Sequence, residues 1–181
     1  ENYQKITLLR QTGWYQEKGK YYSFVMPTGE VLGNQISVIL PHKPHKNPFA
    51  PSGSLEEWNS EALIPASIFP QALLAIGISL AAPLIYFLDN LDGGVFHLYS
   101  ESSSGKSILL GVGASVWGKA SNTNGIVQLW NATGTGIENY AVANNDCCLY
   151  LDEMTNAPQK VVGNAIYTLG NGSAKMRSNK D

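Results

Sequence analysis

Apolar and polar positions alternate in short runs through the first 40 residues, which is the pattern of β-strands. Two aromatic-rich runs flank a polar turn at residues 17–20 and predict a hairpin. A second turn leads to further strand material between Val31 and Leu40. A proline-rich linker follows, so we expect residues 1–53 to form a small β-rich region with its linker.

The pattern changes to helical spacing after this linker. Ser54 and Glu57 have the spacing of a capping box, which predicts the start of a short helix. No residue from Ala62 to Leu88 is charged, but three prolines interrupt the run. Its proline-free piece, Gln71–Ala82, is much shorter than the roughly 20 residues that a membrane-spanning helix needs. We therefore expect a buried helix here and no membrane association, with a membrane span as the alternative.

A short alternating run at Val95–Tyr99 predicts a buried strand, with two glycines in front of it. The small-residue loop Ser100–Gly105 follows, and Lys106 and Ser107 then open an apolar stretch of helical character that ends near Trp117. Strand, small-residue loop, Lys-Ser and helix, in this order, are the context of a phosphate-binding P-loop, the Walker A motif. We therefore predict a nucleotide site in this stretch.

Such a loop needs small residues, because they let successive N–H groups close around phosphate oxygens at a helix N-terminus. Lys106 would act as a catalytic residue on the β- and γ-phosphates, and the Ser107 hydroxyl would ligate Mg²⁺. Ser100 stands where the motif usually has its first glycine, and serine fits there only if its φ is not positive. A plain loop with a solvated Lys106 is the alternative. The predicted nucleotide-binding residues are Glu101, Ser102, Ser103, Ser104, Gly105, Lys106 and Ser107.

Strands and helices alternate through the rest of the chain. Ile126–Trp130 is a second expected strand, a helix should run from Thr135 to about Ala143, and a third strand ends at Leu151. This order predicts an α/β fold, a P-loop NTPase core with a largely parallel sheet, over residues 54–181. Ligands of such a sheet should lie at the carboxyl ends of its strands.

Asp152 and Glu153 directly follow the third strand, which is the arrangement of a Walker B motif. Asp152 would hold Mg²⁺, directly or through water, and Glu153 would act catalytically on the attacking water. An acidic start to the next helix is the alternative. Asn131 and Thr133, at the end of the preceding strand, could sense the γ-phosphate or simply form a turn.

The net charge of −2 conceals an uneven distribution along the chain. Residues 47–158 carry two basic against ten acidic side chains, whereas the two flanks carry a basic excess. Such flanks favour a nucleic acid as a partner, with Lys175, Arg177 and Lys180 as candidate contacts to its backbone. Ordinary surface variation and a solvated basic end are the alternatives.

Composition narrows the class of protein. Hydrophobic residues make up 44% and charged residues 14% of the chain, which is typical of a globular protein. The two cysteines are adjacent and cannot form a disulfide framework. Because the sequence opens without a secretory signal pattern, we expect a cytoplasmic protein.

The chain carries several uncommon blocks: Gly13-Trp14, residues 27–33, Leu55–Trp58, Phe96–Tyr99 with Glu101–Ser107, Ala114–Gly118, Trp130–Thr133, Leu151–Glu153 and Tyr167–Gly172. Together, in this order, they resemble one bacterial family. It is the ATPase domain of Cch-like helicases, which phages, plasmids and other mobile elements carry and which has long been labelled a domain of unknown function. The resemblance covers nearly the whole chain.

This resemblance implies an ATP-dependent, ring-forming DNA helicase or replication ATPase, related to the AAA+ class and similar to MCM-type motors. It implies the same roles for Lys106, Ser107, Asp152 and Glu153 as the motifs do, and a DNA-facing hairpin near residues 175–177. A sensor residue and an arginine finger would follow beyond the last residue, so the chain resembles a truncated core.

The sequence departs from the family pattern at three positions: Ser100 in the loop, and Ala174 and Lys180 near the end. These departures leave two readings of the function. The first is a motor that couples Mg-ATP hydrolysis to nucleic-acid remodelling. The second is a degenerate P-loop module that acts as a nucleotide-binding switch or an assembly scaffold with little turnover.

Overall fold

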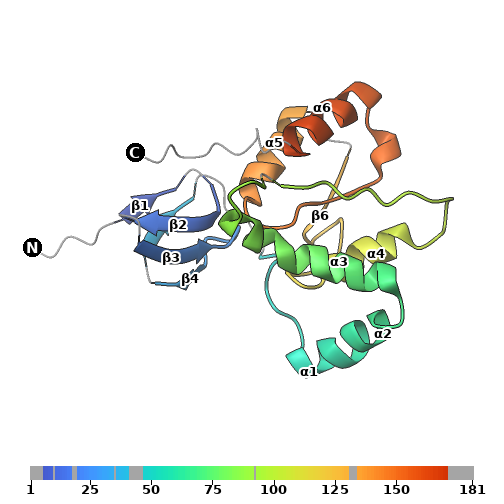
Figure 1. Cartoon of the computed structure of the whole chain (residues 1–181), viewed down its shortest axis with the longest axis horizontal. Coiled ribbons are helices and arrows are strands. Elements are labelled where there is room, and N and C mark those ends of the chain that lie inside the picture. Colours follow the sequence, from blue (N-terminus) through green and yellow to red (C-terminus); the bar gives the residue numbers. More distant parts are fainter. Residues whose placement is uncertain are drawn as a thin grey trace, which may run out of the picture.

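The computed structural model describes residues 6–9, 11–17, 20–34, 36–40, 47–91, 93–130 and 134–170. These residues form a mixed α/β fold with three small sheets, two of them parallel. The N-terminal strands lie at one end of the molecule and the helices gather at the other (Figure 1). The predicted α/β fold is therefore confirmed as a fold class.

The described part of the N-terminal region is built from short strands. They are β1 (Ile6–Leu8), β2 (Gly13–Glu17), β3 (Lys20–Val25), β4 (Val31–Gly33) and β5 (Ser37–Ile39). β2, β3 and β4 form an antiparallel sheet, and β1 pairs with β5 in parallel. The predicted hairpin is confirmed, because Trp14 of β2 lies opposite Phe24 of β3. Their ring centroids are 5.0 Å apart in an edge-to-face contact, and such cross-strand pairs stabilise the register.

The middle of the chain is helical. Its elements are α1 (Leu55–Trp58), the π-helix η1 (Asn59–Leu63), α2 (Ile64–Ala66), α3 (Pro70–Ala81) and the 3₁₀-helix η2 (Ala82–Phe87). The predicted capping box is confirmed. Ser54 Oγ accepts a hydrogen bond from the Glu57 N–H at 3.1 Å, and the Glu57 carboxylate accepts one from the Ser54 N–H at 2.8 Å.

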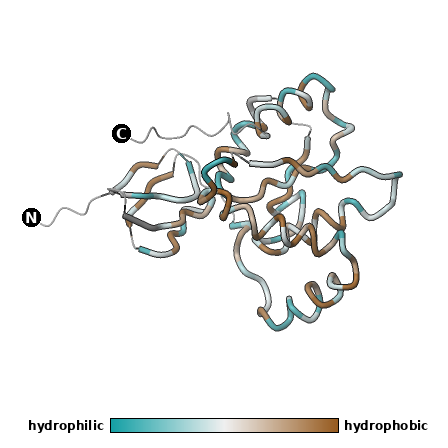
Figure 2. The backbone as a smooth tube through the Cα atoms, viewed as in Figure 1, coloured by the Kyte–Doolittle hydropathy of each residue, from teal (hydrophilic) through white to brown (hydrophobic). Residues whose placement is uncertain are grey.

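One face of α3 is buried and the other is exposed. Ala72, Ile76 and Ser79 are buried, whereas the leucines of the helix are exposed. By length and composition alone, Pro70–Phe87 is a stretch that could cross a membrane: its 18 residues have a mean hydropathy of 1.6, and 17% of them are buried. Figure 2 shows its largely apolar course. The predicted helix is confirmed, but the prediction that it is buried is wrong for the outer face, which no described element covers.

The second half of the chain alternates strands and helices. Its elements are α4 (Lys106–Ala114), β6 (Val127–Leu129), α5 (Gly134–Ala143), β7 (Tyr150–Asp152), the 3₁₀-helix η3 (Met154–Asn156) and α6 (Gln159–Gly170). β6 and β7 are parallel neighbours, with Leu129 opposite Asp152. The helix expected between these strands is α5, which packs against α6. The predicted order of elements is confirmed here.

Three apolar clusters hold these elements together. The first packs Ala114 of α4 against Val127 of β6 and Tyr150 of β7. The second packs α2 and α3 against α4, and the third gathers around the buried Ile137 of α5. Because α4 takes part in the first two clusters, both the parallel strand pair and α3 fix its position.

The prediction of a buried strand at Val95–Tyr99 is wrong. The segment is extended but belongs to no described sheet, and all five of its residues are exposed. It runs past the end of α6, where Val95 lies beside Gly170, and then returns to α4 (Figure 1). An alternating apolar pattern fits any extended segment, whereas a strand also needs a backbone partner. For the same reason the described sheets are smaller than the largely parallel sheet that we predict.

Candidate functional site

The loop between Ser100 and Gly105 folds around the amino group of Lys106. The ammonium donates hydrogen bonds to the backbone oxygen of Ser100 at 2.9 Å and to that of Glu101 at 2.6 Å. A third hydrogen bond goes to Ser104 Oγ at 3.3 Å. The loop therefore satisfies all three donors of the lysine, whose half-buried side chain folds back over it.

Two residues of this loop have a left-handed backbone. Gly105, which precedes α4, has a φ of 89°, and Ser103 has a φ of 59°. Glycine adopts this conformation freely, whereas another residue pays about 1–2 kcal/mol for it. Ser100 does not have a positive φ. The condition that we set for a serine at this position is therefore met.

A cavity of about 910 Å³ opens beside the loop. Ser100, Ser104, Gly105 and Lys106 line one part of it. The rest of its lining is mainly apolar and comes from η1, α2, the start of α3, α4 and the extended segment before the loop. The hollow is open to solvent, and its volume lies within the range of small-molecule sites.

The predicted acidic pair lies at the carboxyl end of β7. Asp152 is the last residue of the strand, and its backbone oxygen accepts a hydrogen bond from the Trp130 N–H at 3.0 Å. Its Oδ1 accepts a second one from the Glu153 N–H at 2.8 Å. Glu153 is exposed and has a left-handed φ of 59°. Neither carboxylate is among the described groups that line the cavity beside Lys106.

The loop helix and the acidic strand are tied together at the other end of α4. The Tyr150 hydroxyl lies within hydrogen-bonding distance of Gly113 O (3.0 Å) and Ser79 Oγ (2.8 Å). Burial raises the pKa of this hydroxyl well above its ordinary value of 10.0, so it stays protonated. This contact joins α3, α4 and β7, and thereby fixes Asp152, two residues further on, relative to the helix that Lys106 begins.

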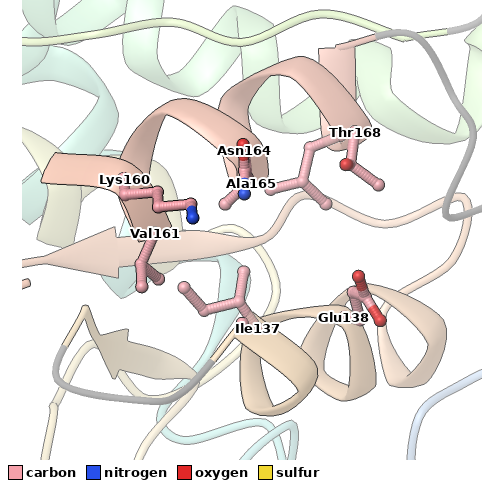
Figure 3. Close-up of a pocket in the computed structure, with 9 residues that line it drawn as sticks. Ile137, Glu138, Lys160, Val161, Asn164, Ala165 and Thr168 are labelled. Carbon is pink, nitrogen blue, oxygen red and sulfur yellow. The ribbon is translucent and has the colours of Figure 1, made fainter. Parts of the chain in front are cut away.

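A second, smaller cavity of about 340 Å³ lies between α5 and α6. Figure 3 shows Ile137 and Glu138 on α5 below, and Lys160, Asn164 and Thr168 on α6 above. It lies apart from the loop, and no residue predicted for the nucleotide site lines it.

The oxygen ligands predicted for Mg²⁺ fit that ion by their chemistry. Ser107 offers an exposed hydroxyl and Asp152 a half-buried carboxylate, and Mg²⁺ is typically held by one or two such groups together with phosphate oxygens and water. Within the described ranges no group of three His, Cys, Asp or Glu side chains could hold a metal by itself. A metal held by Ser107 and Asp152 would therefore need further ligands.

Five predicted site residues lie outside the described residues. They are Asn131 and Thr133, which we expect near the γ-phosphate, and the candidate DNA contacts Lys175, Arg177 and Lys180.

Sequence reasoning missed the aromatic part of the large cavity. Phe69, His97 and Tyr99 line it, although they belong to two segments 28 to 30 residues apart. His97 and Tyr99 flank the loop on its N-terminal side, which is the one sequence signal that could have identified them. Phe69 carries no such signal, because only the packing of α2 and α3 against α4 brings it there.

The whole chain, rather than the loop alone, identifies the family. No curated protein and no solved structure matches the chain. A family model described as "Domain of unknown function (DUF927)" matches residues 1–181. The chain therefore belongs to the DUF927 family.

Proposed function

We propose that this chain is the ATP-binding and hydrolysing domain of a DNA helicase or replication ATPase from a phage or another mobile element. The observation that carries the proposal is the small-residue loop folded around the Lys106 ammonium at the start of α4, beside a large cavity. Such a loop brings a lysine, backbone N–H groups and a helix N-terminus together, and all three attract phosphate. A bound phosphate would replace loop oxygens as the partner of the Lys106 ammonium. A nucleoside triphosphate is the ligand that this combination fits best.

Hydrolysis requires groups beyond phosphate binding. Bound Mg²⁺ would supply neutralisation of charge on the phosphate oxygens. Ser107 and Asp152 would hold the ion, and Glu153 would orient the attacking water and accept its proton. The left-handed backbone of Glu153 supports this assignment, because strained residues cluster at functional sites.

The wider role rests on the sequence resemblance. Coupling to DNA, assembly into a ring in the full-length protein and a cytoplasmic location are what that resemblance and the charge pattern favour. A P-loop core with a largely parallel sheet is part of the same proposal. The basic residues proposed to contact DNA are Lys175, Arg177 and Lys180.

A nucleotide switch or assembly scaffold with little turnover is the second candidate. The specific observation in its favour is that Asp152 and Glu153 do not line the cavity that Lys106 lines, among the residues described. Nucleotide would then bind at the loop without the groups that hydrolysis needs at its γ-phosphate.

Calorimetric titration with Mg-ATP and phosphate release with and without single-stranded DNA test the proposal on the intact protein. We expect Lys106→Ala to abolish ATP binding. Lys119→Ala, which removes an exposed lysine after α4, should leave binding unchanged. Glu153→Gln should keep ATP binding and lose turnover. ATP binding without DNA-stimulated turnover in the wild type would favour the switch, and no ATP binding at all would refute both candidates.

A further inference from the structure

The large cavity combines two kinds of surface in one hollow. The loop part is lined by Lys106, whose ammonium is held by loop oxygens, and by small polar residues. Beyond it the lining becomes apolar and aromatic, with Pro65 and Phe69 from one segment and Leu98 and Tyr99 from another. A phosphate group alone fills only the first kind of surface. The cavity is therefore suited to a ligand with a charged end and a flat apolar end.

The aromatic side chains in this part of the cavity are exposed. Phe69 is 57% exposed and Tyr99 is 85% exposed. The rings of His97 and Tyr99 lie next to each other, with centroids 6.2 Å apart and an angle of 42° between their planes. Exposed aromatic rings that line one cavity beside a phosphate-binding loop are a stacking surface for a base, since every nucleobase has a flat π-face.

We propose that Phe69, His97 and Tyr99 bind the adenine base of the nucleotide whose phosphates lie at the loop. This inference rests on the proposed function. We call the part of the cavity that these three residues line the base-binding wall. Polar groups of the same wall fit the edge of adenine: the Gln71 amide both donates and accepts, and the Glu61 carboxylate accepts from the exocyclic amine. The continuity of the cavity from loop to wall supports one ligand that spans both.

The geometry favours a nucleotide over a polypeptide at this wall. A peptide would cover the aromatic rings equally well but would leave the Lys106 end of the cavity without a negatively charged partner. A triphosphate supplies that charge, and the attached base reaches the aromatic part of the same hollow.

The test compares Mg-ATP with inorganic tripolyphosphate, which has the phosphates but no base, by calorimetry on the intact protein. Phe69→Ala and Tyr99→Ala should each weaken ATP binding about tenfold, which corresponds to the loss of one stacking contact, and leave tripolyphosphate binding unchanged. The matched controls are Leu74→Ala and Tyr167→Ala. These residues are 55% and 73% exposed and lie outside the cavity lining, so both variants should bind ATP as the wild type does.

The outcomes separate this inference from the proposed function. If Phe69→Ala and Tyr99→Ala bind ATP like the wild type while Lys106→Ala does not, the base-binding wall is refuted and the phosphate site stands. If the two aromatic variants lose affinity for ATP and for tripolyphosphate equally, the residues shape the loop and do not contact a base. That result also refutes the inference. If the wild type binds neither ligand, the proposed function itself fails. Thermal unfolding of each variant verifies that the fold is intact.

Discussion

The backbone N–H of Trp14 donates a hydrogen bond of 3.0 Å to Oδ2 of Asp146, which joins the N-terminal sheet to the turn between α5 and β7. Two further hydrogen bonds join the same two segments. Asn145 Nδ2 donates to Thr12 O at 3.1 Å, and Thr12 Oγ1 donates to Ala143 O at 3.1 Å. Thr12, Asn145 and Asp146 are all buried. The N-terminal sheet is thus held by the segment that leads directly into the strand ending at Asp152.

We expect Asp146→Ala to lower the free energy of unfolding by about 1–3 kcal/mol, because the partly buried Trp14 N–H would lose its acceptor. Alanine would also occupy a left-handed backbone, since Asp146 has a φ of 57°. Asp146→Asn should lower the free energy of unfolding less than Asp146→Ala does, because asparagine keeps an oxygen acceptor and tolerates this conformation. Urea unfolding measures both changes. An alanine variant as stable as the wild type would show that the hydrogen bond between Trp14 and Asp146 contributes nothing to stability.

A second prediction concerns the buried hydroxyl of Tyr150. Tyr150→Phe removes the hydrogen bonds to Ser79 and Gly113 but keeps the ring that packs on Ala114, so the free energy of unfolding should fall by about 1 kcal/mol. Tyr167→Phe is the control, because its ring is exposed on α6 and its change should be negligible. Equal stability of the two variants in urea unfolding would contradict the role of the buried contact.

Local signals in the sequence were sufficient to predict where α1 and α4 begin. The capping box at Ser54 and Glu57 predicts the start of α1, and the Lys106-Ser107 pair predicts the start of α4. Each depends on residues within one turn of helix, so the chain nearby determines the outcome. The parallel pairing of β6 with β7 also follows from the strand–helix–strand order.

Predictions that depend on distant partners were weaker. The apolar alternation at Val95–Tyr99 could not show that the segment has no described strand beside it. The place of the Asp152 carboxylate relative to Lys106 likewise depends on how β7 packs on α4. The number of residues between Lys106 and Asp152 does not determine how far apart they lie in space. Phe69 enters the large cavity for the same non-local reason.

The loop gives a prediction about its two unusual positions. Because Ser100 does not have a positive φ, Ser100→Gly should change ATP affinity by less than about twofold. Gly105→Ala should reduce ATP affinity and stability together. A methyl group at Gly105 would meet no atom within 4 Å, so its cost of about 1–2 kcal/mol comes from the φ of 89° alone. Titration with ATP and thermal unfolding measure both; a large gain in affinity for Ser100→Gly would show that the serine distorts the loop.

Two substitutions at Glu153 separate backbone strain from catalysis. Glu153→Gly removes the strain of the left-handed conformation and should stabilise the protein by up to about 1 kcal/mol. It also removes the proposed catalytic carboxylate. Glu153→Gln removes the charge but leaves the strain, so stability should stay unchanged. Both variants should lose ATP turnover. Turnover retained by either would exclude Glu153 as the group that activates water.

The adjacent cysteines predict how stability responds to alkaline pH. Burial, together with the charge of Asp146, raises the pKa of the Cys147 thiol from 9.0 to about 12. Between these values the unfolded thiol loses its proton while the folded thiol keeps it, so the free energy of unfolding should fall as the pH rises above 9. Cys147→Ala should lose less stability than the wild type between pH 8 and pH 10 in urea unfolding. Equal losses in the two proteins would mean that the thiol does not titrate on unfolding in this range.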